Sequence, residues 1–205
     1  MTTITTPLIG LIGKKRTGKD TFAERLVQEH GYTRVALADP LRQAALALDP
    51  IVGTFPLNYN GEVAVGEWRL SDVVRELGWE KAKDFVPEVR RTLQRLGTES
   101  IRAIDDRFWI DAAFRKIDAL RADGKPVVVT DVRYPNEGDA VRQANGYLIR
   151  ISRDMPDDGD AHASEKAMDD YREHLFVGNN GTVEDLWHLA DSVAVDLSHV
   201  YATIQ

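Results

Sequence analysis

Residues 7–21 set the architecture of the whole chain, and they read Pro7-Leu8-Ile9-Gly10-Leu11-Ile12-Gly13-Lys14-Lys15-Arg16-Thr17-Gly18-Lys19-Asp20-Thr21. An apolar run of strand length ends at Gly13, and Gly18-Lys19 opens a pattern of helical period. The spacing G-x-x-x-x-G-K between a strand and a helix is that of a P-loop, which binds nucleotide phosphates. The alternative, a glycine-rich turn that only caps a helix, is disfavoured because a strand precedes the motif and a helix follows it.

The residue types of this loop fit phosphate chemistry. Glycines let successive backbone N–H groups point toward phosphate oxygens, and a helix N-terminus adds partial positive charge. The ammonium of Lys19 can reach the β- and γ-phosphates as a point charge. Asp20 stands where a Ser or Thr magnesium ligand is usual, so either Asp20 or Thr21 is expected to serve. The predicted phosphate-binding residues are Gly13, Lys14, Lys15, Arg16, Thr17, Gly18, Lys19, Asp20 and Thr21.

Composition narrows the function classes. The 205 residues are 43% hydrophobic and 29% charged, which is typical of one globular domain. A net charge of −7 argues against a nucleic acid polymer as partner, since such binding requires an excess of Lys and Arg. No apolar run is long enough to span a membrane, and residues 1–6 lack the features of a signal peptide. The absence of cysteine excludes disulfides and thiolate chemistry, and a reducing cytoplasm is the simplest compartment.

Five apolar segments alternate with helical patterns along the chain. This order predicts an α/β fold of the P-loop NTPase class, with a five-stranded parallel sheet covered by helices on both faces. The expected strands are residues 8–12, 34–38, 126–131, 147–151 and 175–177.

A mostly helical insertion separates the second expected strand from the third. Residues 49–69 contain several Pro and Gly with little periodicity, which predicts a long loop. A short helix is expected from Ser71 to Gly78, another from Pro87, and a long one from Asp106 to about residue 122.

Two charged residues follow expected strands and are therefore candidates for the site. Arg42 lies in the first turn of a helix capped by Asp39-Pro40, near the carboxyl edge of the sheet where open α/β folds bind ligands. A surface salt bridge is an equally good interpretation of Arg42. Asp131 ends the β-branched run of residues 126–131, which suggests a second magnesium-organising position. The alternative is an aspartate that caps the following turn, with Arg133 beside it.

Several blocks in addition resemble bacteriophage-type deoxynucleoside monophosphate kinases. The P-loop is similar, and Asp after the lysine is usual in that family. Further similar blocks follow in family order: Leu93-Gln94-Arg95-Leu96-Gly97-Thr98-Glu99 with Arg102, Phe108-Trp109, Thr130-Asp131-Val132-Arg133-Tyr134-Pro135-Asn136-Glu137, His162-Ala163-Ser164-Glu165 and Asn179-Asn180-Gly181-Thr182.

The resemblance implies a single kinase domain similar to adenylate kinase. Its core would comprise residues 7–48, 107–152 and 171–205, with a helical monophosphate-binding (NMP-binding) region at about 49–106 and a lid at about 153–170. The reaction implied is transfer of the γ-phosphoryl of ATP to a deoxynucleoside monophosphate, giving a dNDP and ADP. ATP and Mg²⁺ are the implied cofactors, and the deoxynucleoside monophosphate is the implied partner.

The resemblance also assigns residues to roles. Asn180, Gly181 and Thr182 fall where related kinases contact the adenine. Lys19 and Mg²⁺ would hold the donor phosphates, the metal with Asp20, Thr21 and Asp131, while Arg16, Arg133 and Arg153 contact the transferring group. The expected monophosphate-binding residues are Arg42, Arg90, Gln94, Thr98 and Arg102.

Other interpretations stay open at this point. A kinase of the same fold such as phosphomevalonate kinase has a similar P-loop, although the block from Gln94 to Thr98 favours a nucleotide acceptor. A regulatory protein that binds ATP without transferring phosphate is the other alternative, and Asp131, Arg133 and a full lid argue against it. Related enzymes are often homodimers, and a phage-encoded chain would work in the host cytoplasm. The roles of His162 and Glu165, and the base accepted, are not decided by these residues.

Overall fold

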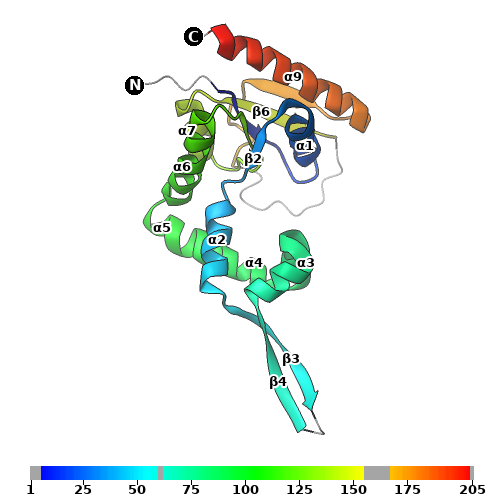
Figure 1. Cartoon of the computed structure of the whole chain (residues 1–205), viewed down its shortest axis with the longest axis vertical. Coiled ribbons are helices and arrows are strands. Elements are labelled where there is room, and N and C mark those ends of the chain that lie inside the picture. The colour runs from blue at the N-terminus through cyan, green and yellow to red at the C-terminus, as the bar shows by residue number, and fades with distance from the viewer. Residues whose placement is uncertain (1–5, 60–61, 155–166, 204–205) are drawn as a thin grey trace. The chain divides into compact units, whose positions relative to one another are not determined.

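The computed structural model describes residues 6–59, 62–154 and 167–203. The chain divides into two compact units (Figure 1). The first unit comprises Met1–Leu37 and Ile110–Gln205, and the second comprises Ala38–Trp109. The second unit is therefore an insertion between the second and third strands of the sheet, as the order of sequence patterns indicated.

The first unit contains the predicted five-stranded parallel sheet. Its strands are β1 (Leu8–Ile12), β2 (Thr33–Val35), β5 (Val127–Val129), β6 (Tyr147–Ser152) and β7 (Leu175–Gly178). They lie in the order β2-β5-β1-β6-β7, and every neighbouring pair is parallel. Each residue of β1 and β5 is buried, because helices cover both faces and leave no side of a strand for water. The fold class is therefore confirmed.

Two layers of helices cover this sheet. On one face α1 (Lys19–His30) and α9 (Val183–Thr203) pack on β1, β6 and β7 through a core that includes Phe22, Leu26 and Leu186. On the other face α6 (Phe108–Ala122) and α7 (Pro135–Gln143) contribute Ile117 and Val141 to a second core. The two cores hold β1 and β6 between them, so the ends of these strands are firmly placed.

The second unit has a core of its own. It contains α2 (Asp39–Leu48), α3 (Leu70–Phe85), α4 (Pro87–Gln94), a π-helical segment η1 (Arg95–Ile101) and α5 (Arg102–Ile104). Buried residues from α2, α3 and α4 pack together there, among them Ala45, Leu70, Val73 and Val89. This unit also includes the first turn of α6.

The expected loop at residues 49–69 is wrong. The structure has a long antiparallel hairpin of β3 (Ile51–Tyr59) and β4 (Glu62–Arg69), shown in cyan in Figure 1. Tyr59 pairs with Glu62. The sequence between these two residues is Asn-Gly, the dipeptide that most strongly predicts a β-hairpin. The prediction of a loop rested on Pro56 and the glycines of this segment. A two-stranded ribbon tolerates proline, because each strand has an edge that pairs with no other strand.

The first helical segment of α3 ends at Gly78, as predicted. Gly78 adopts a non-helical conformation (φ 71°, ψ 163°), and a second helical segment then continues to Phe85. A residue with a Cβ rarely adopts that conformation, so glycine allows a break between two helical segments. The expected lid, residues 153–170, falls largely outside the described residues, and His162 and Glu165 lie there. Among the helices that the structure describes, none combines the length and apolar character needed to cross a membrane.

Candidate active site

The loop from β1 to α1 has the backbone that the P-loop spacing predicts. Gly13 adopts φ 151°, and a Cβ at this position would lie 2.3 Å from the carbonyl oxygen of Ile151. Gly18 adopts φ 102° directly before the first turn of α1. Only glycine accommodates both constraints, so the two glycines of the motif are required by the path of the chain. The N-terminus of a twelve-residue helix lies at the end of this loop, which favours an anion there.

Polar contacts within the loop hold its shape. The Nζ of Lys19 donates to the carbonyl oxygens of Gly13 at 2.7 Å and Lys14 at 2.6 Å, so the ammonium lies over the loop. The hydroxyl of Thr17, which is buried, donates to the Lys14 carbonyl at 3.0 Å. These bonds engage the Gly13 and Lys14 carbonyls with the protein's own donors.

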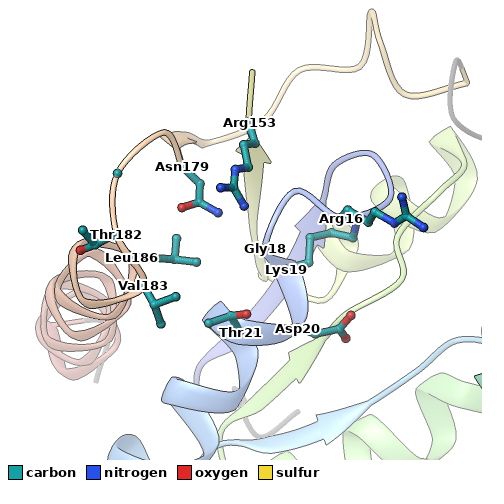
Figure 2. A pocket seen from close by; sticks show the side chains of 11 residues that line it. Arg16, Gly18, Lys19, Asp20, Thr21, Arg153, Asn179, Thr182, Val183 and Leu186 are labelled. Carbon is teal, nitrogen blue, oxygen red and sulfur yellow. The ribbon is translucent and has the colours of Figure 1, made fainter. Parts of the chain in front are cut away.

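A pocket of about 250 Å³ adjoins the loop. Its lining combines the cationic side chains of Lys19 and Arg153 with the apolar side chains of Val183 and Leu186 from α9. Figure 2 shows Arg153 and Asn179 directed into the space between the loop and α9. The pocket is lined by Arg16, Gly18, Lys19, Asp20, Thr21, Arg153, Asn179, Gly181, Thr182, Val183 and Leu186.

Most of the predicted ATP-binding residues meet at this pocket, although they come from distant parts of the sequence. Gly181 and Thr182 lie beside the loop because β7 ends next to β6 and the chain then turns into α9. The side chain of Asn180 is engaged elsewhere: its Nδ2 donates to Asp154 Oδ2 at 2.7 Å, and its Oδ1 accepts from the Asp154 amide at 2.8 Å. Gly13, Lys14, Lys15 and Thr17 belong to the loop but are not among the residues that line the pocket.

The first turn of α9 is fixed by a reciprocal cap. The backbone amide and the hydroxyl of Thr182 donate to Asp185 Oδ2, each at 2.9 Å, and the Asp185 amide donates back to the Thr182 hydroxyl. The hydrogen bond from the Thr182 amide holds the pKa of the Asp185 carboxyl below its usual value. Hydrogen bonds between Thr182 and Asp185, three residues apart, therefore fix the conformation of Thr182 beside the pocket.

Asp20 and Thr21 bring a carboxylate and a hydroxyl to the lining of the pocket. Asp20 Oδ1 lies 2.8 Å from the Nη2 of Arg34, and its side chain is largely exposed. No group of three or more His, Asp or Glu side chains that could hold a metal ion occurs among residues 6–59, 62–154 and 167–203. Mg²⁺ in nucleotide sites is held by phosphate oxygens, water and one or two protein oxygens. An exposed carboxylate and a hydroxyl at the loop fit that requirement.

Asp131 and Arg133 lie at the carboxyl edge of the sheet but do not line the pocket. Asp131 Oδ1 accepts a hydrogen bond of 2.7 Å from the Leu37 amide, which ties the ends of β5 and β2 together. The Glu137 carboxylate accepts from the amides of Arg133 and Tyr134, so the turn before α7 is capped. The Arg133 side chain itself is exposed.

Three residues of the pocket were not predicted individually: Asn179, Val183 and Leu186. Asn179 belongs to the block Asn179–Thr182 that resembles the kinase family. What distinguishes it from Asn180 is its burial, and burial depends on the fold and cannot be read from the sequence. Val183 and Leu186 recur at helical spacing in the sequence, and that spacing does not distinguish a core position from a pocket wall.

The predicted monophosphate-binding residues all belong to the second unit. Arg42 lies 3.3 Å from Glu80 and 5.6 Å from the centre of the Trp79 ring. Arg90 lies 3.3 Å from Asp84. Gln94 ends α4, Thr98 lies in η1, and Arg102 begins α5.

Close packing fixes η1 within the second unit. A Cβ on Gly97 would lie 2.6 Å from the side chain of Leu41, so α2 approaches the backbone of η1 directly. The indole of Trp109 donates to the Gly97 carbonyl at 3.1 Å. Thr98 is therefore carried on a backbone that its neighbours hold in place.

Comparison with known proteins adds to this geometry. A family model described as deoxynucleotide monophosphate kinase matches residues 57–189. A protein of Acanthamoeba polyphaga mimivirus is 28% identical over 190 residues, covering 88% of this chain and 92% of that protein. The deoxynucleotide monophosphate kinase of Enterobacteria phage T4 is 22% identical over 237 residues, covering 88% and 95% of the two chains. The structure of dephospho-CoA kinase from Campylobacter jejuni is similar with a TM-score of 0.51 at 14% identity, covering 94% of this chain and 97% of that chain, which supports the fold alone.

Proposed function

Because the chain belongs to the deoxynucleotide monophosphate kinase family, it is a phosphotransferase that acts on deoxynucleoside monophosphates, and we propose how its residues divide that work. The family match does not favour the two alternatives. One is a phosphomevalonate-type kinase, and the other is a regulatory protein that binds ATP without transferring phosphate. The proposed reaction transfers the γ-phosphoryl of ATP to a monophosphate and yields a dNDP and ADP. One observation carries the assignment of the donor site: a single pocket extends from the P-loop lysine to an apolar wall on α9.

ATP is the proposed occupant of this pocket. Its phosphates would lie against the loop and Lys19, where the amides and the helix N-terminus favour negative charge. Its base would lie toward Gly181, Thr182 and Leu186, because an aromatic ring gains from burial against apolar side chains. Lys14, Lys15 and Asn180 would contribute from the border of the site.

Mg²⁺ is proposed to bind with the donor nucleotide. Asp20 or Thr21 would hold it, and Asp131 would act from the edge of the sheet. When bound, the ion neutralises charge on the donor phosphates. The Asp20 Oδ1 lies 2.8 Å from the Nη2 of Arg34, which holds the carboxylate.

The acceptor is proposed to bind the second unit, where α4 carries Arg90 and α2 carries Arg42. These two arginines would pair with the monophosphate, since a guanidinium forms two parallel hydrogen bonds to phosphate oxygens. Gln94 and Thr98 would bind the base or sugar, with Arg102 beside them.

The chemistry requires alignment more than proton transfer. The nucleophile is an anionic phosphate oxygen, so no general base is needed, and catalysis depends on positioning and on neutralising charge. Arg153 lines the donor pocket, and Arg16 and Arg133 lie on the loop and at the sheet edge. These three arginines are the proposed contacts of the transferring group. Residues 153–170 are the proposed lid, whose closure would exclude water from the reaction.

A substrate screen tests this proposal. ATP and Mg²⁺ are incubated with each common deoxy- and ribonucleoside monophosphate and with phosphomevalonate, and ADP formation is followed by a coupled assay. Turnover is expected with at least one deoxynucleoside monophosphate and is lost when EDTA removes the metal. Binding of ATP without transfer to any monophosphate would contradict the proposal.

The variant Lys19→Ala tests the donor site within the same assay. Loss of the ammonium removes a charge that acts on the donor phosphates, so kcat should fall by roughly 10² or more. Lys125→Ala, an exposed lysine after α6, serves as the control and should leave kcat unchanged.

A further inference from the structure

The side-chain amide of Asn179 is buried next to the loop between β1 and α1. Only 8% of this residue is exposed, although asparagine is usually found at the surface. Its Nδ2 donates to the carbonyl oxygen of Thr17 at 2.9 Å, in a hydrogen bond that is itself buried. Figure 2 shows the Asn179 side chain beside the start of α1. The residue therefore connects the end of β7 with the loop after β1.

This connection is rigid at both ends. The backbone N–H of Asn179 donates to the Ser152 carbonyl at 2.7 Å. This bond lies just beyond the pairing of Ser152 in β6 with Gly178 in β7. A Cβ on Gly18 would lie 2.4 Å from the Asn179 Nδ2, so the loop backbone is packed directly against this amide. Neither side can shift without disturbing the sheet or the loop.

The bond to Thr17 has a consequence for the next residue. In a trans peptide the C=O and the following N–H point in opposite directions. Holding the Thr17 carbonyl toward Asn179 therefore directs the Gly18 N–H to the other side. Gly18 has no side chain to resist a rotation of this peptide, and its φ of 102° belongs to a region that glycine enters and leaves readily. A carbonyl turned toward the phosphates would repel them.

We propose that Asn179 is a positioning residue that fixes the Thr17–Gly18 peptide so that its N–H is presented to the phosphates of the donor nucleotide. The inference rests on the proposed function only in naming ATP as the donor. The binding of an anion by the loop can be tested without that assignment. The short segment between β7 and α9 thus contacts the loop through Asn179 and lines the pocket with Gly181 and Thr182.

The variant Asn179→Leu tests the proposal because leucine has a similar branched shape but cannot donate. Binding of inorganic tripolyphosphate with Mg²⁺ is measured by titration calorimetry. Its affinity should fall by about tenfold or more, the effect of leaving a buried carbonyl without a donor. The KM for ATP should rise, whereas the KM for the monophosphate should not change.

A second variant and a matched control separate positioning from stability. Asn179→Asp replaces the donor by an acceptor facing the Thr17 carbonyl and should also weaken tripolyphosphate binding. Tyr201→Phe removes another buried side-chain donor in the same unit, the hydroxyl that donates to the Asn145 carbonyl. This control should lower the melting temperature without changing tripolyphosphate affinity.

The outcomes distinguish this inference from the proposed reaction. Unchanged tripolyphosphate affinity in Asn179→Leu would overturn it, even if the chain is a kinase as proposed. Failure of both Asn179 variants to fold would also overturn it, because the residue would then serve the core. If the wild-type protein binds tripolyphosphate but phosphorylates no monophosphate, the proposed reaction fails while the role of Asn179 can still be read from binding.

Discussion

Arg90 illustrates how much a single residue depends on its neighbours. It lies on α4 with its guanidinium 3.3 Å from the Asp84 carboxylate, and about half of its side chain is exposed (53%). Such a pair contributes little to stability, because solvent screens both charges. The arginine can therefore exchange Asp84 for a phosphate at small cost.

We expect Arg90→Ala to raise the KM for the monophosphate by roughly tenfold or more, the effect of losing hydrogen bonds to a charged group. The kcat should change less, since the residue is proposed to bind the acceptor. Steady-state kinetics with varied monophosphate measure both quantities. Arg75→Ala is the matched control, because Arg75 is an exposed arginine paired with Asp72 in the same unit. An unchanged KM in Arg90→Ala would remove this residue from the site.

At the scale of elements, α1 and α9 are joined by one ionic cluster. Asp191 of α9 accepts hydrogen bonds from Arg25 of α1 at 2.8 and 2.9 Å, and it lies 2.8 Å from the Nε2 of His30. The Arg25 guanidinium, and then His30, hold the pKa of the Asp191 carboxyl well below its usual value. The helix that carries the loop is thereby fixed to the helix that bounds the pocket.

A lowered pKa in the folded state gives a stability contribution that is present above the unfolded pKa and is lost as the pH falls through the folded value. Asp191→Asn should therefore reduce the free energy of unfolding at neutral pH, because the neutral amide lacks the charge that attracts Arg25 and His30. The difference from wild type should shrink below about pH 4, where the unfolded carboxyl binds a proton.

Urea denaturation at several pH values measures this difference. Glu29→Gln is the control, because Glu29 lies 3.4 Å from the same arginine but is half exposed. It should change stability little at any pH. A difference for Asp191→Asn that is independent of pH would contradict the electrostatic explanation.

Elements with strong local signals were predictable, and the hairpin was not. The apolar runs of β1 and β5 and the periodic pattern of α9 identify their elements without tertiary information. The β3–β4 hairpin pairs eight register positions across strands that contain Pro56 and Gly53. Pairing with a neighbouring strand compensates for poor β-propensity, and that compensation is invisible in a single segment.

At the scale of the whole molecule, the proposed donor and acceptor residues belong to different units. The residues that line the proposed donor pocket lie between positions 16 and 21, at position 153 and between positions 179 and 186, all in the first unit. The proposed acceptor residues lie between residues 42 and 102, in the second unit. This division follows from the insertion of one unit between β2 and β5 of the other.

Hydrogen exchange should report this division. A non-hydrolysable ATP analogue with Mg²⁺ should slow amide exchange in the loop before α1 and in residues 179–186, because bound ligands stabilise the segments they contact. A deoxynucleoside monophosphate alone should slow exchange in α4 and η1. Mass spectrometry of peptides from each sample measures both effects. Protection of α4 and η1 by the ATP analogue alone would contradict the division.

The sequence by itself determined the phosphate-binding loop, the five parallel strands and the presence of an insertion, because these depend on local patterns of glycine, apolar and β-branched residues. Only the tertiary structure decided which residues share the pocket. Asn179 and Leu186 lie more than 150 residues from Gly18, and they meet it because β6 and β7 pair beside β1 and α9 packs on α1. The sequence does not distinguish a buried asparagine from an exposed one. The free energy of burying the amide differs only once the surrounding chain excludes water.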